Sequence, residues 1–324
     1  MKDRLNYWRR IFKVYFSKTP SYLIFWHEKP AVSESIIFDK LGVYYMTFRD
    51  KANYAGPKDK NGVILFDYYF DIGRQYNPLA VAQYGLGHYN LYLKTAEKEH
   101  LDIAKIQADW LVQNLENNDF GIPVWKHKFR WHYKKYLEAG WFSAHSQGAG
   151  ISLLARIYQE TKDKKYFEAG QKAFLSLNLK IKEGGVKFID GKGDVWLEEY
   201  LVEPTTHILN GFLWALWGVW DYYLLTGDEK AKNLFNTCVK TLKENLGRYD
   251  IGFWSLYDLS EQTLKMIASH FYHNLHIVQL KATYILAKEP IFEEYYKKFE
   301  NYQKNRFYKF IALIYKMVFK LFYF

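Results

Sequence analysis

The chain has 324 residues, of which 49% are hydrophobic and 20% are aromatic, and its formal net charge at pH 7 is +10. This length suffices for one large domain or two modest ones, and the positive charge favours polyanions such as acidic polysaccharide, nucleic acid or anionic membrane. No zinc-spaced, Gly-rich or Lys/Arg-rich motif points to nucleic acid, so we expect no such partner. The single Cys238 excludes a disulfide within the chain, which is compatible with the cytoplasmic location that we expect.

Residues 1–75 are the least regular part of the sequence. Segments 39–54 and 62–72 are rich in β-forming residues and predict a few short strands. The first 18 residues lack the apolar core and the small-residue cleavage site of a signal peptide. We expect 1–75 to be a helical and β segment that packs on the domain that follows.

A repeat of helical pairs begins at residue 76. Each of its four units has an apolar first helix, a short polar turn and a more charged second helix, and the turns begin at Thr95, Thr161, Thr226 and near Ala287. The first helices are apolar nearly all round and must be buried, whereas the second helices have one apolar stripe and face solvent. We therefore predict a mainly α fold, an α/α barrel of about four helical hairpins over 76–305, with the apolar helices inside.

Longer links join each hairpin to the next. They cover 121–136, 184–200 and 250–260, and they combine β-forming residues, alternation and Gly turns. This pattern predicts short β-hairpins at the rim where the inner helices begin.

Residues 306–324 predict a basic amphipathic helix at the C-terminus, with Lys309, Lys316 and Lys320 among apolar residues. Because such a segment can lie in a membrane interface, and because both ends of the chain are basic and aromatic, peripheral contact with the inner membrane face stays open. We favour the other interpretation, in which this helix packs on the barrel and its lysines face water. No apolar run reaches the roughly 18 residues of a spanning helix.

Polar side chains occur near the start of the four buried inner helices. Burying such groups is costly unless they find hydrogen-bond partners. Hydrogen bonding inside the core explains any single one of them, but their recurrence at one end of the ring predicts a shared polar cavity. The residues that we expect to bind a substrate there are Gln83, His88, His145, Gln147, Asn210, His273 and His276.

The rim links add ionisable groups, namely Glu199 and Tyr200, Tyr257 and Tyr272. A carboxylate and several phenols around a cavity can transfer protons when burial and neighbouring groups tune their pKa values. Three histidines at 270, 273 and 276 would fan by about 120° round a helix, so we expect no metal site. The sequence has no nucleotide-binding motif, and we expect no cofactor.

Five motifs occur in the order of a known family. They are AQYGLGHYN from Ala82, WFSAHSQGAGIS from Trp141, WLEEYLVEPTTHILNGF from Trp196, SLYDL from Ser255 and YHNLHIVQL from Tyr272. Over about residues 77–280 the chain resembles the C-terminal domain of the D-glucuronyl C5-epimerases, which modify heparan sulfate and heparosan. The resemblance implies an isomerase that converts D-glucuronic acid to L-iduronic acid in an acidic polysaccharide.

The resemblance also assigns roles to individual residues. Glu199, Tyr200, Tyr257 and Tyr272 match the family residues that transfer the proton and hold the uronate. We take Glu199 and Tyr272 as the opposed acid and base, with Tyr200 and Tyr257 hydrogen-bonded to the substrate carboxylate.

The chain departs from the family pattern where the family has two arginines. Ser260 follows the YDL motif, and Ser269-His270-Phe271 precedes the YH motif. A cation there would help to bind a carboxylate or sulfate, and the candidate substitutes are Arg74, Lys128, Arg130 and Lys265. The large β-domain that precedes the barrel in animal members is missing or reduced to residues 1–75, so the chain resembles a compact microbial relative.

Three other functions stay open at this point. A polysaccharide lyase also removes the C5 proton, but it then expels the C4 oxygen. A glycoside hydrolase needs two carboxylates across the scissile bond, which the Tyr-rich rim does not favour. A non-catalytic module would only bind polyanions or membranes. The sequence leaves a homodimer open as well.

Overall fold

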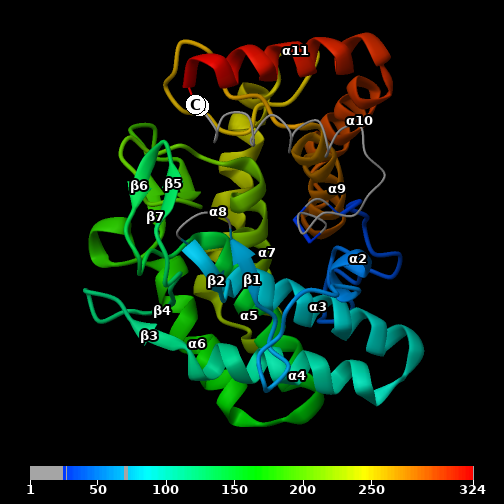
Figure 1. Cartoon of the computed structure of the whole chain (residues 1–324), viewed down its shortest axis with the longest axis vertical. Helices are drawn as coiled ribbons and strands as arrows, with labels where there is room; N and C mark the ends of the chain where they lie inside the picture. Colours follow the sequence, from blue (N-terminus) through cyan, green and yellow to red (C-terminus); the bar gives the residue numbers. More distant parts are fainter. Residues whose placement is uncertain (1–24, 27, 69–71, 324) are drawn as a thin grey trace.

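The computed structural model describes residues 25–26, 28–68 and 72–323. Eight of the helices in this part of the chain form four hairpins, each an inner helix followed by an outer one (Figure 1). The hairpins are α3 (Pro78–Thr95) with α4 (Lys98–Gln113), α5 (Ala144–Thr161) with α6 (Lys164–Asn178), α7 (Leu209–Thr226) with α8 (Glu229–Asn245), and α9 (His270–Ala287) with α10 (Pro290–Lys304).

The turns inside the first three hairpins share one structure. Thr95, Thr161 and Thr226 end the inner helices, and each hydroxyl donates to the carbonyl four residues earlier. Each hydroxyl also accepts the N–H two residues later, at 3.1–3.2 Å. The residue after each threonine is left-handed, with φ between 59° and 68°, which ends the helix and turns the chain. The repeated threonines therefore mark real helix ends.

The inner helices pack in chain order, α3 on α5, α5 on α7 and α7 on α9. They are buried over most of their length, whereas the outer helices bury a single stripe. The closest approach joins α5 and α7: a Cβ added to Gly218 would lie 2.3 Å from the Cα of Gly148. The prediction of a mainly α fold, an α/α barrel with apolar helices inside, is confirmed.

An N-terminal segment, residues 28–52, lies between the first and last inner helices. Its short helix α2 (Arg49–Ala52) packs on α3, and Ala31 and Val32 line a hollow together with Ile277 and Val278 of α9. Figure 1 shows α2 between α9 and α3. The ring of four hairpins is thus completed by this segment.

The strands expected near the N-terminus are only partly present. Strand β1 (Phe66–Tyr68) pairs with β2 (Gly73–Gln75), while 69–71 lie outside the described residues, as does the N-terminal stretch 1–24. Segment 39–54 forms one isolated bridge, between Val32 and Met46, and then α2. The expectation of strands there is wrong, since Tyr44, Tyr45 and Met46 are consecutive and all buried, without the alternation of a strand that has one buried face.

Short hairpins are present in the first two links. Strand β3 (Leu115–Asn117) pairs with β4 (Pro123–Trp125), β5 (Trp131–Tyr133) with β6 (Lys135–Leu137), and β7 (Lys187–Ile189) with β8 (Val195–Leu197). The third link, 250–260, forms only isolated bridges. Figure 1 shows β5, β6 and β7 together at one side of the ring, near the level where α7 and α9 begin.

Helix α11 (Arg306–Tyr323) crosses the end of the molecule above α7 and α9 (Figure 1). It packs on the loop before α9, where the Lys316 Nζ donates to the Ile267 carbonyl at 2.6 Å. The expectation that its lysines face water is therefore wrong for Lys316. No helix within 25–26, 28–68 and 72–323 is both long and apolar enough to cross a membrane.

A buried ion pair fastens the N-terminal segment to the barrel. The Arg156 Nη1 of α5 lies 2.6 Å from the Asp221 Oδ2 of α7, and both side chains are fully buried. The Tyr45 hydroxyl donates to Asp221 at 2.5 Å, and the Arg156 Nε donates to the Gly42 carbonyl at 2.9 Å. Two inner helices and the N-terminal segment therefore share one charge network.

We expect Asp221→Asn to lower the free energy of unfolding by about 3–5 kcal/mol, because it leaves the Arg156 guanidinium buried without a counter-charge. Urea unfolding measures this change. The matched control is Glu138→Gln, which breaks the exposed pair with Arg130 and should cost only about 0–1 kcal/mol. Equal effects of the two substitutions would show that the buried network does not stabilise the fold.

Candidate active site

Glu199, Tyr200, Tyr257 and Tyr272 meet at the rim where the inner helices begin. Glu199 and Tyr200 follow β8, Tyr257 lies in the loop between α8 and α9, and Tyr272 lies in the first turn of α9. The Tyr257 hydroxyl is 3.5 Å from the Glu199 Oε1, and its ring meets the Tyr272 ring edge to face at 4.9 Å. The three phenols lie in one aromatic cluster at the rim, and Tyr272 also packs against the barrel core. The fold thus gathers all four proton-transfer candidates.

The first turn of α7 holds the Glu199 carboxyl. The Asn210 Nδ2 donates to the Glu199 Oε2 at 3.2 Å. A Cβ on Gly211 would lie 2.2 Å from the same oxygen, so only glycine leaves room for the carboxyl there. The helix N-terminus also favours a negative charge at this point. Helix α7 therefore fixes the position of Glu199.

Burial raises the pKa of Glu199 to about 8, although hydrogen bonds from Tyr200, Tyr257 and Asn210 oppose the rise. Burial, and then the charge of Glu199, raise the pKa of Tyr272 and of Tyr257 above the ordinary value of a phenol. The phenols thus stay protonated near neutral pH and can donate protons. The carboxyl ionises only near pH 8 and is then a stronger base than an ordinary glutamate.

The β5–β6 hairpin adds two residues that the sequence analysis missed. The Tyr133 ring stacks on Tyr200 at 4.3 Å, and its hydroxyl donates to the Asp258 Oδ2 at 2.7 Å. Lys134, at the turn of this hairpin, places its Nζ 2.8 Å from the same Asp258 oxygen and donates to the Ser260 hydroxyl. No signal in the sequence identified them, because alternation along a strand does not show which distant loop it meets.

Cations are present at Ser260, where the family pattern has an arginine. Besides Lys134, the Lys265 Nζ donates to the Ser260 carbonyl at 3.4 Å. The other three candidate substitutes form ion pairs elsewhere: Arg74 with Asp67, Lys128 with Glu116, and Arg130 with Glu138. Two lysines therefore lie at the position where the family pattern has an arginine.

The polar residues expected to bind a substrate fall into two groups. One group keeps a buried side-chain nitrogen or oxygen without a hydrogen-bond partner among the described residues, and such atoms are available to a ligand or to water. Among the predicted residues it contains Gln83, His88 through its Nε2, His145, Asn210 and His276. Of these, Asn210 also contacts Glu199 directly.

The second group contains Gln147 and His273, whose polar atoms bond to other elements, and His88 shares in it through its Nδ1 alone. His88 pairs with His100 of α4 at 2.9 Å. The Gln147 amide bonds to both the N–H and the carbonyl of Trp125 in β4, and the His273 Nε2 bonds to the Phe299 carbonyl of α10. The structure does not bring these three side chains to Glu199. They fasten the inner helices to their surroundings.

We expect the free energy of unfolding of the wild-type protein to decrease between about pH 5 and about pH 9, when the same quantity for Glu199→Gln is taken as the reference. The folded pKa of about 8 lies above the ordinary 4.5, so the bound proton stabilises the folded state at low pH. That contribution, on the order of a few kcal/mol, is lost as the pH rises through 8. Chemical unfolding of both proteins across this range measures it. Parallel stability profiles would show that Glu199 ionises normally.

The comparisons with known proteins agree with the motifs. The model of the D-glucuronyl C5-epimerase C-terminus matches residues 118–301. The chain belongs to this family. It is 32% identical over 209 residues to the D-glucuronyl C5-epimerase of Caenorhabditis elegans. The aligned region covers 60% of this chain and 34% of that protein. The resemblance inferred from the sequence is confirmed, although the chain spans about a third of this C5-epimerase.

One more similar protein and two similar solved structures accompany this C5-epimerase. The uncharacterized protein MJ1128 of Methanocaldococcus jannaschii is 28% identical over 195 residues, or 59% of this chain and 62% of that protein. Among solved structures, the family 76 glycoside hydrolase (mannosidase) Bt3792 of Bacteroides thetaiotaomicron is similar with a TM-score of 0.46, 14% identity, and coverage of 70% of this chain and 58% of that one. The unsaturated glucuronyl hydrolase of Bacillus sp. GL1 has a TM-score of 0.44, 14% identity and coverage of 72% and 61%.

Proposed function

We propose that this C5-epimerase family member inverts C5 of D-glucuronic acid residues in an acidic polysaccharide, giving L-iduronic acid. The observation that carries the proposal is the buried Glu199 carboxyl, with a pKa of about 8, among three phenols. The family and its Caenorhabditis elegans member, named a D-glucuronyl C5-epimerase, support the same reaction.

The reaction requires a base, an acid and a cation. The C5 hydrogen lies next to a carboxylate and is weakly acidic, because its removal adds charge beside an existing anion. Catalysis therefore depends on stabilising the enediolate that forms. Lys134 and Lys265 supply positive charge beside the phenols, and the Tyr200 and Tyr257 hydroxyls are available as hydrogen-bond donors to the same oxygens.

The residues divide the proton transfer between them. The ionised Glu199 takes the C5 proton from one face of the sugar ring, and its raised pKa makes it a better base than an ordinary carboxylate. The Tyr272 hydroxyl gives a proton to C5 from the other face, which inverts the centre. Tyr257 contacts both groups and so offers a hydroxyl through which the proton returns to Tyr272.

We expect the protein to incorporate deuterium at C5 when it is incubated with a glucuronate polymer in heavy water, as measured by NMR. Glu199→Gln and Tyr272→Phe should each lower the rate by roughly 10²–10⁴-fold, since each removes one proton-transfer group. Tyr136→Phe is the control. It alters an exposed phenol of the β5–β6 hairpin and should leave the rate unchanged. Exchange that survives both site substitutions would remove the assignment, and an unsaturated product with ultraviolet absorbance would identify a lyase instead.

We expect Lys134→Gln to raise KM for the glucuronate polymer roughly 10- to 100-fold, because a charge-assisted contact to the uronate carboxylate is lost. Lys134→Arg, which keeps the charge, should restore most of the binding. Lys128→Gln is the matched control, because Lys128 forms an exposed ion pair with Glu116. An unchanged KM in a Lys134→Gln variant that melts like the wild type would exclude this role.

A further inference from the structure

Helix α11 turns an apolar row away from the protein. Phe307, Phe310, Ile314, Val318 and Leu321 are between 38% and 66% exposed. Their spacing of three and four residues places them on one side of the helix. A surface helix of a globular protein normally presents polar residues to solvent. The outer side of α11 does the opposite.

The inner side of the helix explains how it is held. Ala312 and Phe319 are buried against the protein, and the Lys316 Nζ donates to the Ile267 carbonyl at 2.6 Å. Burial lowers the pKa of Lys316 to about 8. The helix is therefore anchored through a face that includes a lysine, while larger apolar side chains remain outside. This orientation leaves the apolar row available for a partner.

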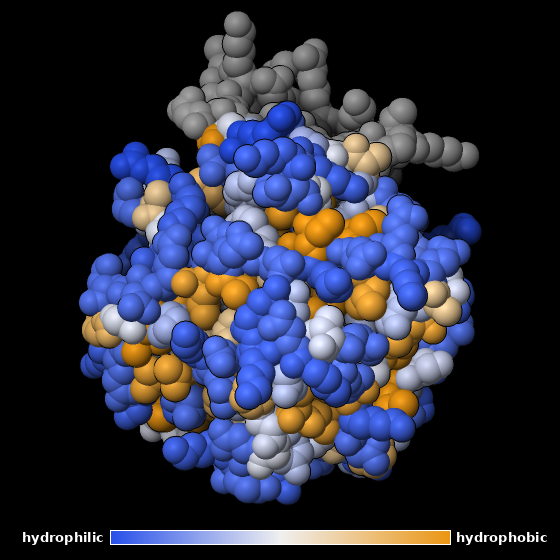
Figure 2. All heavy atoms as spheres, turned by 90° about the horizontal axis from the view of Figure 1, so that it is seen from below, coloured by the Kyte–Doolittle hydropathy of each residue, from blue (hydrophilic) through white to orange (hydrophobic). Residues whose placement is uncertain are grey.

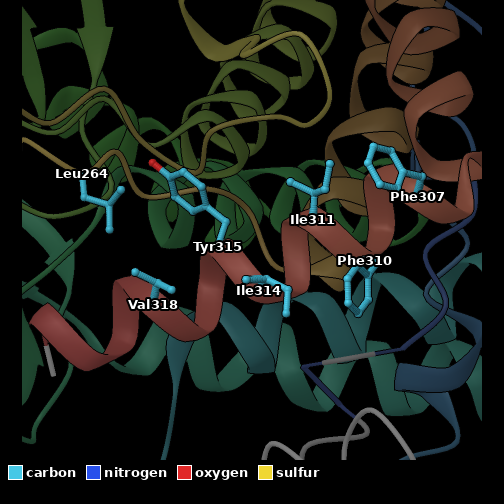
Figure 3. A pocket seen from close by; sticks show the side chains of 7 residues that line it. All are labelled: Leu264, Phe307, Phe310, Ile311, Ile314, Tyr315 and Val318. Carbon is cyan, nitrogen blue, oxygen red and sulfur yellow. The ribbon is translucent and has the colours of Figure 1, made fainter.

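Most of this row also lines a hollow of about 440 Å³ beside the loop before α9. We define the α11 apolar face by the residues that line this hollow: Leu264, Phe307, Phe310, Ile311, Ile314, Tyr315 and Val318. Figure 3 shows Phe310, Ile314 and Val318 along one edge of the helix and Leu264 opposite Tyr315. By contrast, the face at the other end of the molecule intersperses apolar with hydrophilic side chains (Figure 2). A continuous apolar face of this kind marks an interaction surface.

The charges around this face select its partner. Helix α11 carries no carboxylate, and besides the inward-facing Lys316 it carries Arg306, Lys309 and Lys320, while the exposed Lys265 adjoins Leu264. Apolar side chains flanked by cations suit an anionic lipid surface, where the rings enter the acyl boundary and the long basic side chains reach the headgroups. A second copy of this chain would instead bring like charges together, since each copy has a net charge of +10.

We propose that the α11 apolar face docks this protein on an anionic lipid membrane, with α11 lying in the plane of the interface. Helix α11 packs on the 258–267 loop that follows Tyr257, so docking turns the end of the barrel that carries the candidate active site toward the membrane (Figure 1). This surface is independent of the proposed reaction, and it is tested without any substrate.

The test is flotation of the full chain with vesicles of phosphatidylcholine alone or mixed with phosphatidylglycerol. We expect binding to the mixed vesicles and an at least ~10-fold loss of affinity in the variant Phe310→Asp/Ile314→Asp, because two exposed apolar side chains can no longer enter the bilayer. Phe307→Asp serves as a milder second variant with the same expected direction. Phe120→Asp is the matched control, since Phe120 is 61% exposed in the β3–β4 turn, away from α11.

Two results would overturn the proposal. The first is a failure of the lipid test. Either the wild-type protein stays unbound in the presence of phosphatidylglycerol vesicles, or the variants melt like the wild type and bind as it does. The other is a dimer, seen by analytical ultracentrifugation without lipid, that Phe310→Asp/Ile314→Asp dissociates. In that case a second copy of the chain covers the α11 apolar face.

Discussion

The contact between the backbones of α5 and α7 sets the position of α7, whose first turn holds Glu199. Gly148 and Gly218 allow these helices to approach more closely than any side chain would permit, because a Cβ at either position would collide with the other helix. Helix α7 in turn carries Asn210, which donates to Glu199, and Gly211, which leaves room for that carboxyl. The geometry of the candidate active site is thus a consequence of how closely two inner helices pack. Because protein interiors are close-packed and hardly compressible, a change in the distance between these helices would shift the residues that α7 carries.

The buried carboxyl groups at the two ends of the barrel have different surroundings. At one end, Asp221 is buried with Arg156 in direct contact, so both charges are compensated and the network holds the N-terminal segment in place. At the other end, no ion pair to Glu199 is found within the described part of the chain, and its pKa rises to about 8. A buried charge without a close counter-ion is unfavourable, so the carboxyl holds its proton. One arrangement stabilises the fold, and the other gives the protein a group suited to proton transfer.

Positive charge gathers at the site end of the molecule. Lys134 and Lys265 meet at Ser260, and Lys316 of α11 reaches the same loop at Ile267. Asp258 compensates part of this charge, through its contact with Lys134, and it also accepts the Tyr133 hydroxyl. This charge favours the approach of anionic groups in general, as both the proposed substrate and the proposed lipid surface would require. The α11 apolar face and the aromatic cluster share the 257–267 segment, which links the two proposals physically without making either depend on the other.

The sequence by itself determined the hairpin repeat, the distinction between inner and outer helices, and the choice of Glu199 and the three family tyrosines as candidate site residues. Periodicity encodes which face of a helix is buried, and the family motifs occur in the same order along the chain as in the family. Only the tertiary structure decided that Tyr133 and Lys134 join the site, that His88, Gln147 and His273 bond to outer elements, and that α11 exposes its apolar row. Each of these depends on which distant segment a side chain meets, and a local pattern of apolar and polar residues does not contain that information.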